Sequence, residues 1–203
     1  MKKTILLLIF FASVIISFAQ KETYDLATYT PPVNWKKEVT DFAVGYSRAN
    51  NTDTSLCRIT VYKSFASKGS IDLDFNSEWQ ILIANPYQTT SPSQINKTQE
   101  ATGWKIKAGA GSFIFKNKKA LAMITVFSGY NICYSILAIC NNEKYIQDIQ
   151  NFIAYVELKQ PERSNDVVVN NNQLKNSYVI GSWGKSNSVS QLYNRYGTYS
   201  YNK

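Results

Sequence analysis

Residues 120–140 read ALAMITVFSGYNICYSILAIC and form the most apolar stretch that follows the N-terminal segment. A run of this length resembles a membrane span, but residues 128–131 (Ser-Gly-Tyr-Asn) interrupt it with polar, turn-forming positions. On either side lie short β-rich runs, residues 121–127 and 132–139. The pattern therefore predicts a central β-hairpin whose strands are buried on both faces.

Strands are also predicted on both sides of this hairpin in the chain. Residues 42–48 form a short strand, and residues 56–62 alternate between apolar and polar side chains, which indicates a half-buried strand paired with it. Residues 104–108 and 112–115 suggest two further strands. We expect Gly109-Ala110-Gly111 to form the turn between them, because glycine tolerates turn backbones.

Two segments have helical periodicity. Phe75, Trp79 and Leu82 recur at helical spacing in residues 70–83. A second helix follows the capping residue Asn142, and its apolar face contains Ile146, Ile149, Phe152, Ile153 and Val156. Residues 20–158 are therefore predicted to form an α+β domain, with an antiparallel sheet of about six to seven strands and both helices on one face.

The N-terminal residues 1–19 are predicted to be a secretory signal peptide. Lys2 and Lys3 precede an apolar run, and Ser17 and Ala19 place small residues before the cleavage site. The run is about a dozen residues, whereas a membrane-spanning helix needs roughly 20. Gln20 is the expected first mature residue, and because it is not Cys no lipid anchor is expected. We therefore expect a secreted or periplasmic protein with no stable membrane insertion.

The C-terminal part changes in composition. Residues 159–176 are polar and low in complexity, as linkers are. Residues 177–203 contain alternating tyrosines around Gly197, which indicates a β-hairpin. About 27 residues are too few for an independent barrel or sandwich. The tail is therefore expected to be the incomplete start of a β-rich domain.

Composition excludes several kinds of chemistry. The chain has no histidine, which removes imidazole bases, histidine-dependent nucleophiles and histidine-ligated zinc. We expect no metal and no cofactor. Without Lys2 and Lys3 the 22 basic residues become 20, which against 14 acidic residues give a net charge of +6. The basic residues are scattered rather than arranged in a stripe, so no nucleic-acid partner is expected.

The three cysteines leave two interpretations open. Cys133 and Cys140 lie seven residues apart on one predicted strand, which separates them by roughly 23 Å and places them on opposite faces. Cys57 could form a disulfide with Cys133 or with Cys140 if its strand is adjacent to theirs. Alternatively, all three are buried thiols that pack as small apolar residues.

Acidic residues cluster on the first predicted helix. Asp74 and Glu78 are four residues apart on one face, and Asp72 lies nearby. Paired carboxylates about 5 to 9 Å apart can cleave glycosides. A solvated acidic face near the positive N-terminal end of the helix explains the same residues more simply.

Several motifs resemble known families. Residues 25–32, 35–38 and 57–62, together with Glu78-Trp79 and the final hairpin and helix, resemble exported bacterial proteins of unassigned function. The first domain is similar to the PsbP-like fold, which implies a helix-flanked antiparallel sheet used as an accessory module. Gly181-Ser182-Trp183 and residues 197–201 resemble the first strands of a lipocalin-like β-barrel. Neither resemblance implies catalytic residues at positions of this chain.

We therefore expect an exported, non-catalytic binding or accessory protein for a ligand of the cell envelope or the extracellular medium. Its expected contact residues are Tyr87, Tyr193, Tyr196 and Tyr199, which combine apolar area with a polar tip. Ordinary strand filling is the other interpretation of these tyrosines. The alternative function is a carboxylate-dependent hydrolase of cell-envelope carbohydrate. The oligomeric state and the identity of the ligand remain open.

Overall fold

The computed structural model describes residues 20–89, 92–115 and 117–161, and the backbone of three two-residue strands, 178–179, 192–193 and 199–200. The predicted signal peptide, residues 1–19, residues 162–176 of the predicted linker and residue 177 lie outside the described residues. Within the described part of the chain, no helix is both long and apolar enough to cross a bilayer.

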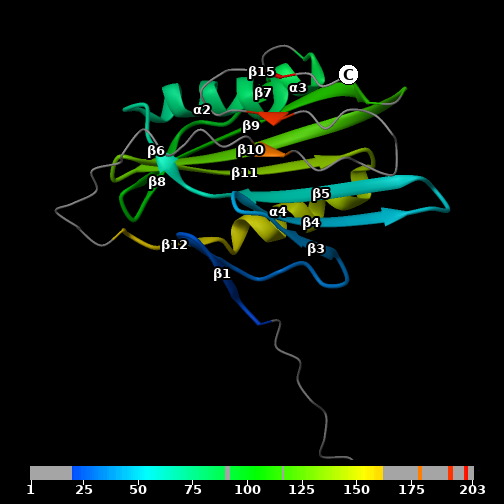
Figure 1. The fold of residues 1–203 in the computed structure, drawn as a ribbon, viewed down its shortest axis with the longest axis horizontal. Coiled ribbons are helices and arrows are strands. Elements are labelled where there is room, and N and C mark those ends of the chain that lie inside the picture. Colours follow the sequence, from blue (N-terminus) through cyan, green and yellow to red (C-terminus); the bar gives the residue numbers. More distant parts are fainter. Residues whose placement is uncertain are drawn as a thin grey trace, which may run out of the picture.

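The core of the fold is a nine-stranded antiparallel sheet (Figure 1). Its main path runs β3-β4-β5-β11-β10-β9-β7, while β6 pairs with β11 and β8 pairs with β9. The predicted α+β class and the antiparallel sheet are confirmed. In chain order the strands are β3 (Lys36–Val39), β4 (Ala43–Asn50), β5 (Ser55–Tyr62), β6 (Phe65–Ala66), β7 (Gln94–Ile95), β8 (Gln99–Ala101), β9 (Trp104–Phe115), β10 (Lys118–Gly129) and β11 (Ile132–Cys140).

The central hairpin is the one predicted from residues 120–140. Strands β10 and β11 pair from Leu121–Cys140 to Gly129–Ile132, and the turn residues Tyr130 and Asn131 have φ angles of 53° and 60°. Two successive left-handed residues match a two-residue type I′ hairpin, whose twist agrees with that of the strands. Alternate side chains of β11 enter two different cores, so the prediction of burial on both faces is confirmed.

Each helical segment begins after a capping residue, whose side chain accepts a hydrogen bond from a backbone amide of the first turn. The side chain of Ser70 accepts a hydrogen bond from the Leu73 amide (3.2 Å) at the start of α2 (Ile71–Trp79), which continues into a π-helical turn, η1 (Gln80–Ala84), and the short α3 (Asn85–Tyr87). Asn142 accepts from the Lys144 amide (3.0 Å) before the 3₁₀ turn η2 (Glu143–Tyr145) and α4 (Ile146–Ala154).

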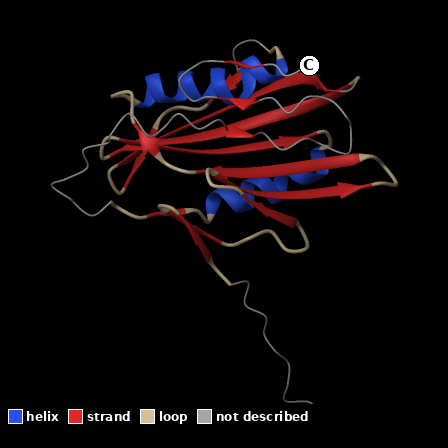
Figure 2. Cartoon of the chain, in the orientation of Figure 1, coloured by secondary structure: helices blue, strands red, loops and turns tan. Residues whose placement is uncertain are grey.

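The two long helices pack on opposite faces of the sheet, as Figure 2 shows. Phe75 and Trp79 of α2 belong to one core, whereas Ile149 and Phe152 of α4 belong to the other. The prediction of both helices on one face is therefore wrong. The hairpin explains why the helices lie on opposite faces. Its strands are apolar on both sides, so each side of the sheet needs a cover.

A small sheet completes the α4 side. It contains β1 (Glu22–Tyr24), β2 (Ala27–Tyr29) and β12 (Glu157–Leu158) in the order β1-β2-β12, which joins the first and last described segments of the domain. The Tyr29 ring lies 5.2 Å from the Phe152 ring of α4. In the tail, β13 (Tyr178–Val179), β14 (Leu192–Tyr193) and β15 (Tyr199–Ser200) pair in an antiparallel sheet.

The predicted turn at Gly109-Ala110-Gly111 is wrong, because β9 is one continuous strand through these residues. The glycines instead allow α2 to approach the sheet. A Cβ atom on Gly109 would stand 2.6 Å from Cζ of Phe75, and one on Gly111 would stand 2.9 Å from the Trp79 ring. Two aromatic side chains of α2 thus rest directly on the β9 backbone.

We predict that Gly109→Ala lowers the free energy of unfolding by about 1–3 kcal/mol, because the new methyl group overpacks the contact with Phe75. Urea denaturation of the variant measures this loss. Phe75→Leu in the Gly109→Ala background removes the atoms that clash and should recover part of it. If the losses of the single variants Gly109→Ala and Phe75→Leu simply add in the double variant, this contact is contradicted.

Candidate binding site

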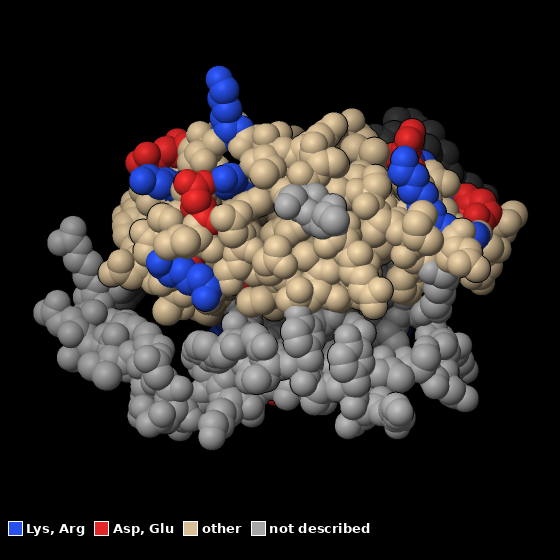
Figure 3. All heavy atoms as spheres, turned by 90° about the horizontal axis from the view of Figure 1, so that it is seen from above, with Lys and Arg blue, Asp and Glu red and all other residues tan. Residues whose placement is uncertain are grey.

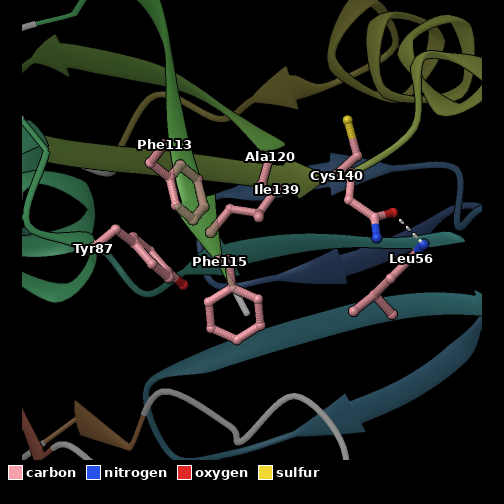
Figure 4. Close-up of a pocket in the computed structure, with 8 residues that line it drawn as sticks. Leu56, Tyr87, Phe113, Phe115, Ala120, Ile139 and Cys140 are labelled. Carbon is pink, nitrogen blue, oxygen red and sulfur yellow. Dashed lines mark hydrogen bonds between the residues drawn. The ribbon is translucent and has the colours of Figure 1, made fainter. Parts of the chain in front are cut away.

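An apolar cavity of about 30 Å³ lies at the end of α3, beside the edge of the α2-side core. Its walls are the side chains of Leu56, Tyr87, Phe113, Phe115, Ala120 and Ile139, with Cys140 and Asn141 at one end. Figure 4 shows rings from α3 and β9 meeting residues from β5 and β11 around this space. A concave apolar site with a few polar groups at its rim is the usual form of a small-ligand site.

Local structure explains how the aromatic walls are placed. Phe113 and Phe115 are two residues apart on β9, so both point to the same face of the sheet. Tyr87 is the last residue of α3, and Gln88 ends that helix with a left-handed φ of 50°. The Tyr87 ring lies 4.4 Å from the Phe113 ring and 6.3 Å from the Phe115 ring, measured between centroids.

The cavity borders a more polar part of the same sheet face. Helix α2 packs on β9 and β10. On β5, Cys57, Ile59 and Val61 point into the α4-side core, so the alternate residues Arg58 and Thr60 point to the α2 side. In Figure 3, which looks onto the α2 side, charged side chains gather toward the two ends of the described surface.

Arg58 is a charged group on the same sheet face as the cavity. It donates from Nη1 to Oε2 of Glu38 (2.8 Å) and from Nε to Oγ1 of Thr60 (3.3 Å), and only 17% of its side chain is exposed. Hydrogen bonds from Lys36 and Arg58 lower the pKa of Glu38. The guanidinium lies over Gly45, where a Cβ atom would stand 2.5 Å from Nη2. Glycine at this position lets the arginine lie flat along the sheet.

Tyr87 is part of the apolar wall, and the Arg58 charge acts on its hydroxyl. Burial raises the pKa of Tyr87 to about 12, and the Arg58 charge acts in the opposite direction. At the other end of the cavity, Asn141 Oδ1 accepts from the Leu56 amide (2.7 Å), the bond drawn in Figure 4. The site therefore combines an apolar interior with a cationic group and a hydroxyl at its border.

The structure brings together only part of the predicted tyrosine set. Tyr87 lines the cavity but is half-buried rather than exposed. Tyr193 and Tyr199 are backbone partners in β14 and β15, and Tyr196 lies outside the described residues. Sequence reasoning missed Phe113 and Phe115, although their i, i+2 spacing on a strand was a usable signal.

The acidic cluster of α2 is mostly buried. Asp74 has no exposed surface, and its carboxylate accepts from Ser67 Oγ, Ser128 Oγ and the Lys68 amide, each at 2.6 Å. The interpretation of a solvated acidic face is therefore wrong for this residue. The carboxylate thus accepts from two donors of the loop before α2 and from the buried Ser128 hydroxyl of β10.

Glu78 is likewise fully buried and accepts a hydrogen bond from Ser135 Oγ of β11. Only Asp72 is exposed, and it pairs with Lys107 (2.5 Å). A glycosidase pair must contact its sugar, whereas Asp74 and Glu78 have no surface to present. No observation in the described residues favours the hydrolase alternative.

The structure separates the two candidate partners of Cys57. Cys140 is its direct partner across β5 and β11, and both side chains lie in the α4-side core. Cys133 lies in the α2-side core on the other face of β11, so a Cys57–Cys133 bond is excluded. All three are thiols in the structure. Among the described residues, no three Cys, Asp or Glu residues cluster as metal ligands would.

A second hollow of about 470 Å³ lies beside the β4–β5 loop and is lined by Arg48, Ala49, Asn50, Asn51, Lys144, Tyr145 and Asp148. Its walls are mostly polar, and Lys144 is paired with Asp53 (2.5 Å). An open, polar surface of this kind gives a ligand little apolar burial. The smaller apolar cavity is therefore the better candidate site.

Comparisons with known proteins add little. No protein-family model matches the chain, and none of the curated proteins does. A crystal structure from Bacteroides thetaiotaomicron VPI-5482 is similar at 13% identity with a TM-score of 0.44, covering 79% of this chain and 52% of that chain. The chain thus spans about half the length of that structure.

We predict that Asp74→Ala destabilises the fold by about 2–4 kcal/mol, because the buried Ser128 hydroxyl and the part-buried Ser67 hydroxyl and Lys68 amide lose their acceptor. Asp72→Ala on the same helix turn is the matched control and should change stability by less than about 1 kcal/mol, as expected for an exposed ion pair. Chemical denaturation of both variants measures the difference, and equal losses would refute the role given to Asp74.

A second prediction concerns alkaline pH. The raised pKa of Tyr87 means that the folded protein binds more protons than the unfolded chain between pH 10 and about pH 12. Stability should therefore fall with rising pH through that window. In Tyr87→Phe this fall should be shallower by up to about 1.4 kcal/mol per pH unit. Tyr155→Phe, which removes an exposed hydroxyl, is the matched control, and an equal change in both variants would contradict the assignment.

Proposed function

We propose that this protein is an exported, non-catalytic binding or accessory protein whose ligand contacts the Tyr87 cavity. In this proposal a PsbP-like domain, residues 20–158, precedes the opening strands of a lipocalin-like module. The observation that carries the proposal is the aromatic-walled cavity on the α2 side of the sheet, the same sheet face to which Arg58 points. The predicted signal peptide supplies the compartment, so the ligand is one met in the cell envelope or the medium.

The chemistry of the cavity suggests the class of ligand. A volume of about 30 Å³ accommodates a small apolar tip, such as the end of an alkyl chain, rather than a whole cofactor. The described hydrogen bonds of Arg58 use two of its five N–H groups, and the chain without its signal peptide has a net charge of +6. Charge complementarity therefore favours an anionic head group beside the apolar tip.

A series of n-alkanoates from acetate to octanoate tests this function. Affinity, followed by NMR chemical-shift titration, should rise about three- to fourfold per added methylene until the cavity is filled, and then level off. Arg58→Gln should weaken binding of every member of the series by a similar factor, because the head group is shared.

The control variants separate the cavity from general surface effects. Ala120→Leu fills the cavity and should remove the dependence on chain length, whereas Ala101→Leu makes the same change at an exposed position of β8 and should leave it intact. Circular dichroism confirms that each variant is folded. Absence of binding, or a chain-length dependence that survives Ala120→Leu, would refute the site.

A further inference from the structure

Cys57 and Cys140 occupy a position that suits a cross-strand disulfide. They are direct partners in the register of β5 and β11, and their exposed fractions are 0% and 2%. Both side chains point to the α4 side of the sheet, and Figure 4 shows the Cys140 sulfur pointing away from the cavity.

The hydrogen-bond pattern sets the spacing of the two strands at this point. The Asn141 amide donates to the Leu56 carbonyl (3.1 Å), so Leu56 and Asn141 form a hydrogen-bonded pair. Because the two kinds of pair alternate in an antiparallel ladder, Cys57 and Cys140 form a non-hydrogen-bonded pair, in which Cα atoms are about 4.5 Å apart. Disulfides span Cα separations of about 4.4–6.8 Å, so bond formation needs no rearrangement of the strands.

The two thiols face each other across β5 and β11. The neighbouring Cys140 thiol, together with burial, raises the pKa of the Cys57 thiol. Cys133 offers an internal comparison, since it is equally buried but lies in the α2-side core on the opposite face of β11. A bond between Cys57 and Cys133 would have to pass through the sheet.

We propose that Cys57 and Cys140 are an oxidative modification site that becomes a disulfide when the exported chain folds in the presence of a small-molecule or protein disulfide. One cysteine thiolate attacks a sulfur of the oxidant, which forms a mixed disulfide and releases one oxidant thiolate. The second cysteine thiolate then attacks the mixed disulfide, which forms the Sγ–Sγ bond and releases the other thiolate. Two electrons pass to the oxidant, whose two thiolates take up the two protons.

The timing follows from burial. Both sulfurs lie beneath α4 in the folded protein, so exchange takes place before α4 packs on β5 and β11. Once formed, the bond joins strands that are separated in sequence by α2, β9 and β10. A cross-link that closes so long a segment restricts the unfolded chain strongly and therefore stabilises the fold.

The test is refolding of the chain from residue 20 to residue 203 in a buffer of oxidised and reduced glutathione. Thiol titration in denaturant should find one thiol per chain instead of three, and the intact mass should be about 2 Da lower through loss of two hydrogens. Trypsin leaves Cys133 and Cys140 in one peptide, between Lys119 and Lys144, so the link is mapped after cleavage at Tyr134.

Cys133→Ser is the matched control and should still form the link, leaving no titratable thiol. Cys57→Ser and Cys140→Ser should each retain two thiols. The oxidised wild-type protein should melt about 5–10 °C above the reduced form, and Cys133→Ser should show the same shift. Three titratable thiols in the refolded wild-type protein, or a link that includes Cys133, would overturn the proposal; the wild-type measurement keeps the test valid even if a serine variant fails to fold.

Discussion

The fold depends on the burial of the β10–β11 hairpin on both of its faces. A strand that alternates between apolar and polar side chains needs one cover, whereas β11 presents buried side chains in both directions. Two separate cores result, one beneath α2 and one beneath α4. The hairpin therefore separates these two cores, and α2 and α4 cover its two faces.

On the α2 side, the helix packs very closely against the sheet. Gly109 and Gly111 remove the side chains that would hold α2 away from β9, and Phe75 and Trp79 fill the space. The buried carboxylate of Asp74 accepts hydrogen bonds from three donors of the loop before α2 and of β10. The helix is consequently held in one position by shape and by hydrogen bonds together.

The candidate site lies where the helices that cover the α2 side of the sheet end. Helix α2 continues through η1 into α3, and Tyr87 closes the last turn against β9. Beyond that point the same sheet face carries Arg58 and Thr60 instead of apolar residues. A boundary between an apolar core and a charged strand surface is thus exposed at the cavity, and this is the property on which the proposed binding function depends.

Local patterns in the sequence were enough for the hairpin, the strand at residues 56–62, both helices and the cap at Asn142, because periodicity and capping act over a few residues. Tertiary structure decided which face each helix covers, that β9 runs straight through its glycines, and that Asp74 is buried. It also decided that Cys57 faces Cys140 rather than Cys133, and that Phe113 and Phe115 meet Tyr87. These outcomes depend on which distant segment becomes the neighbour, and a residue's own sequence context carries no information about the surface that will be packed against it.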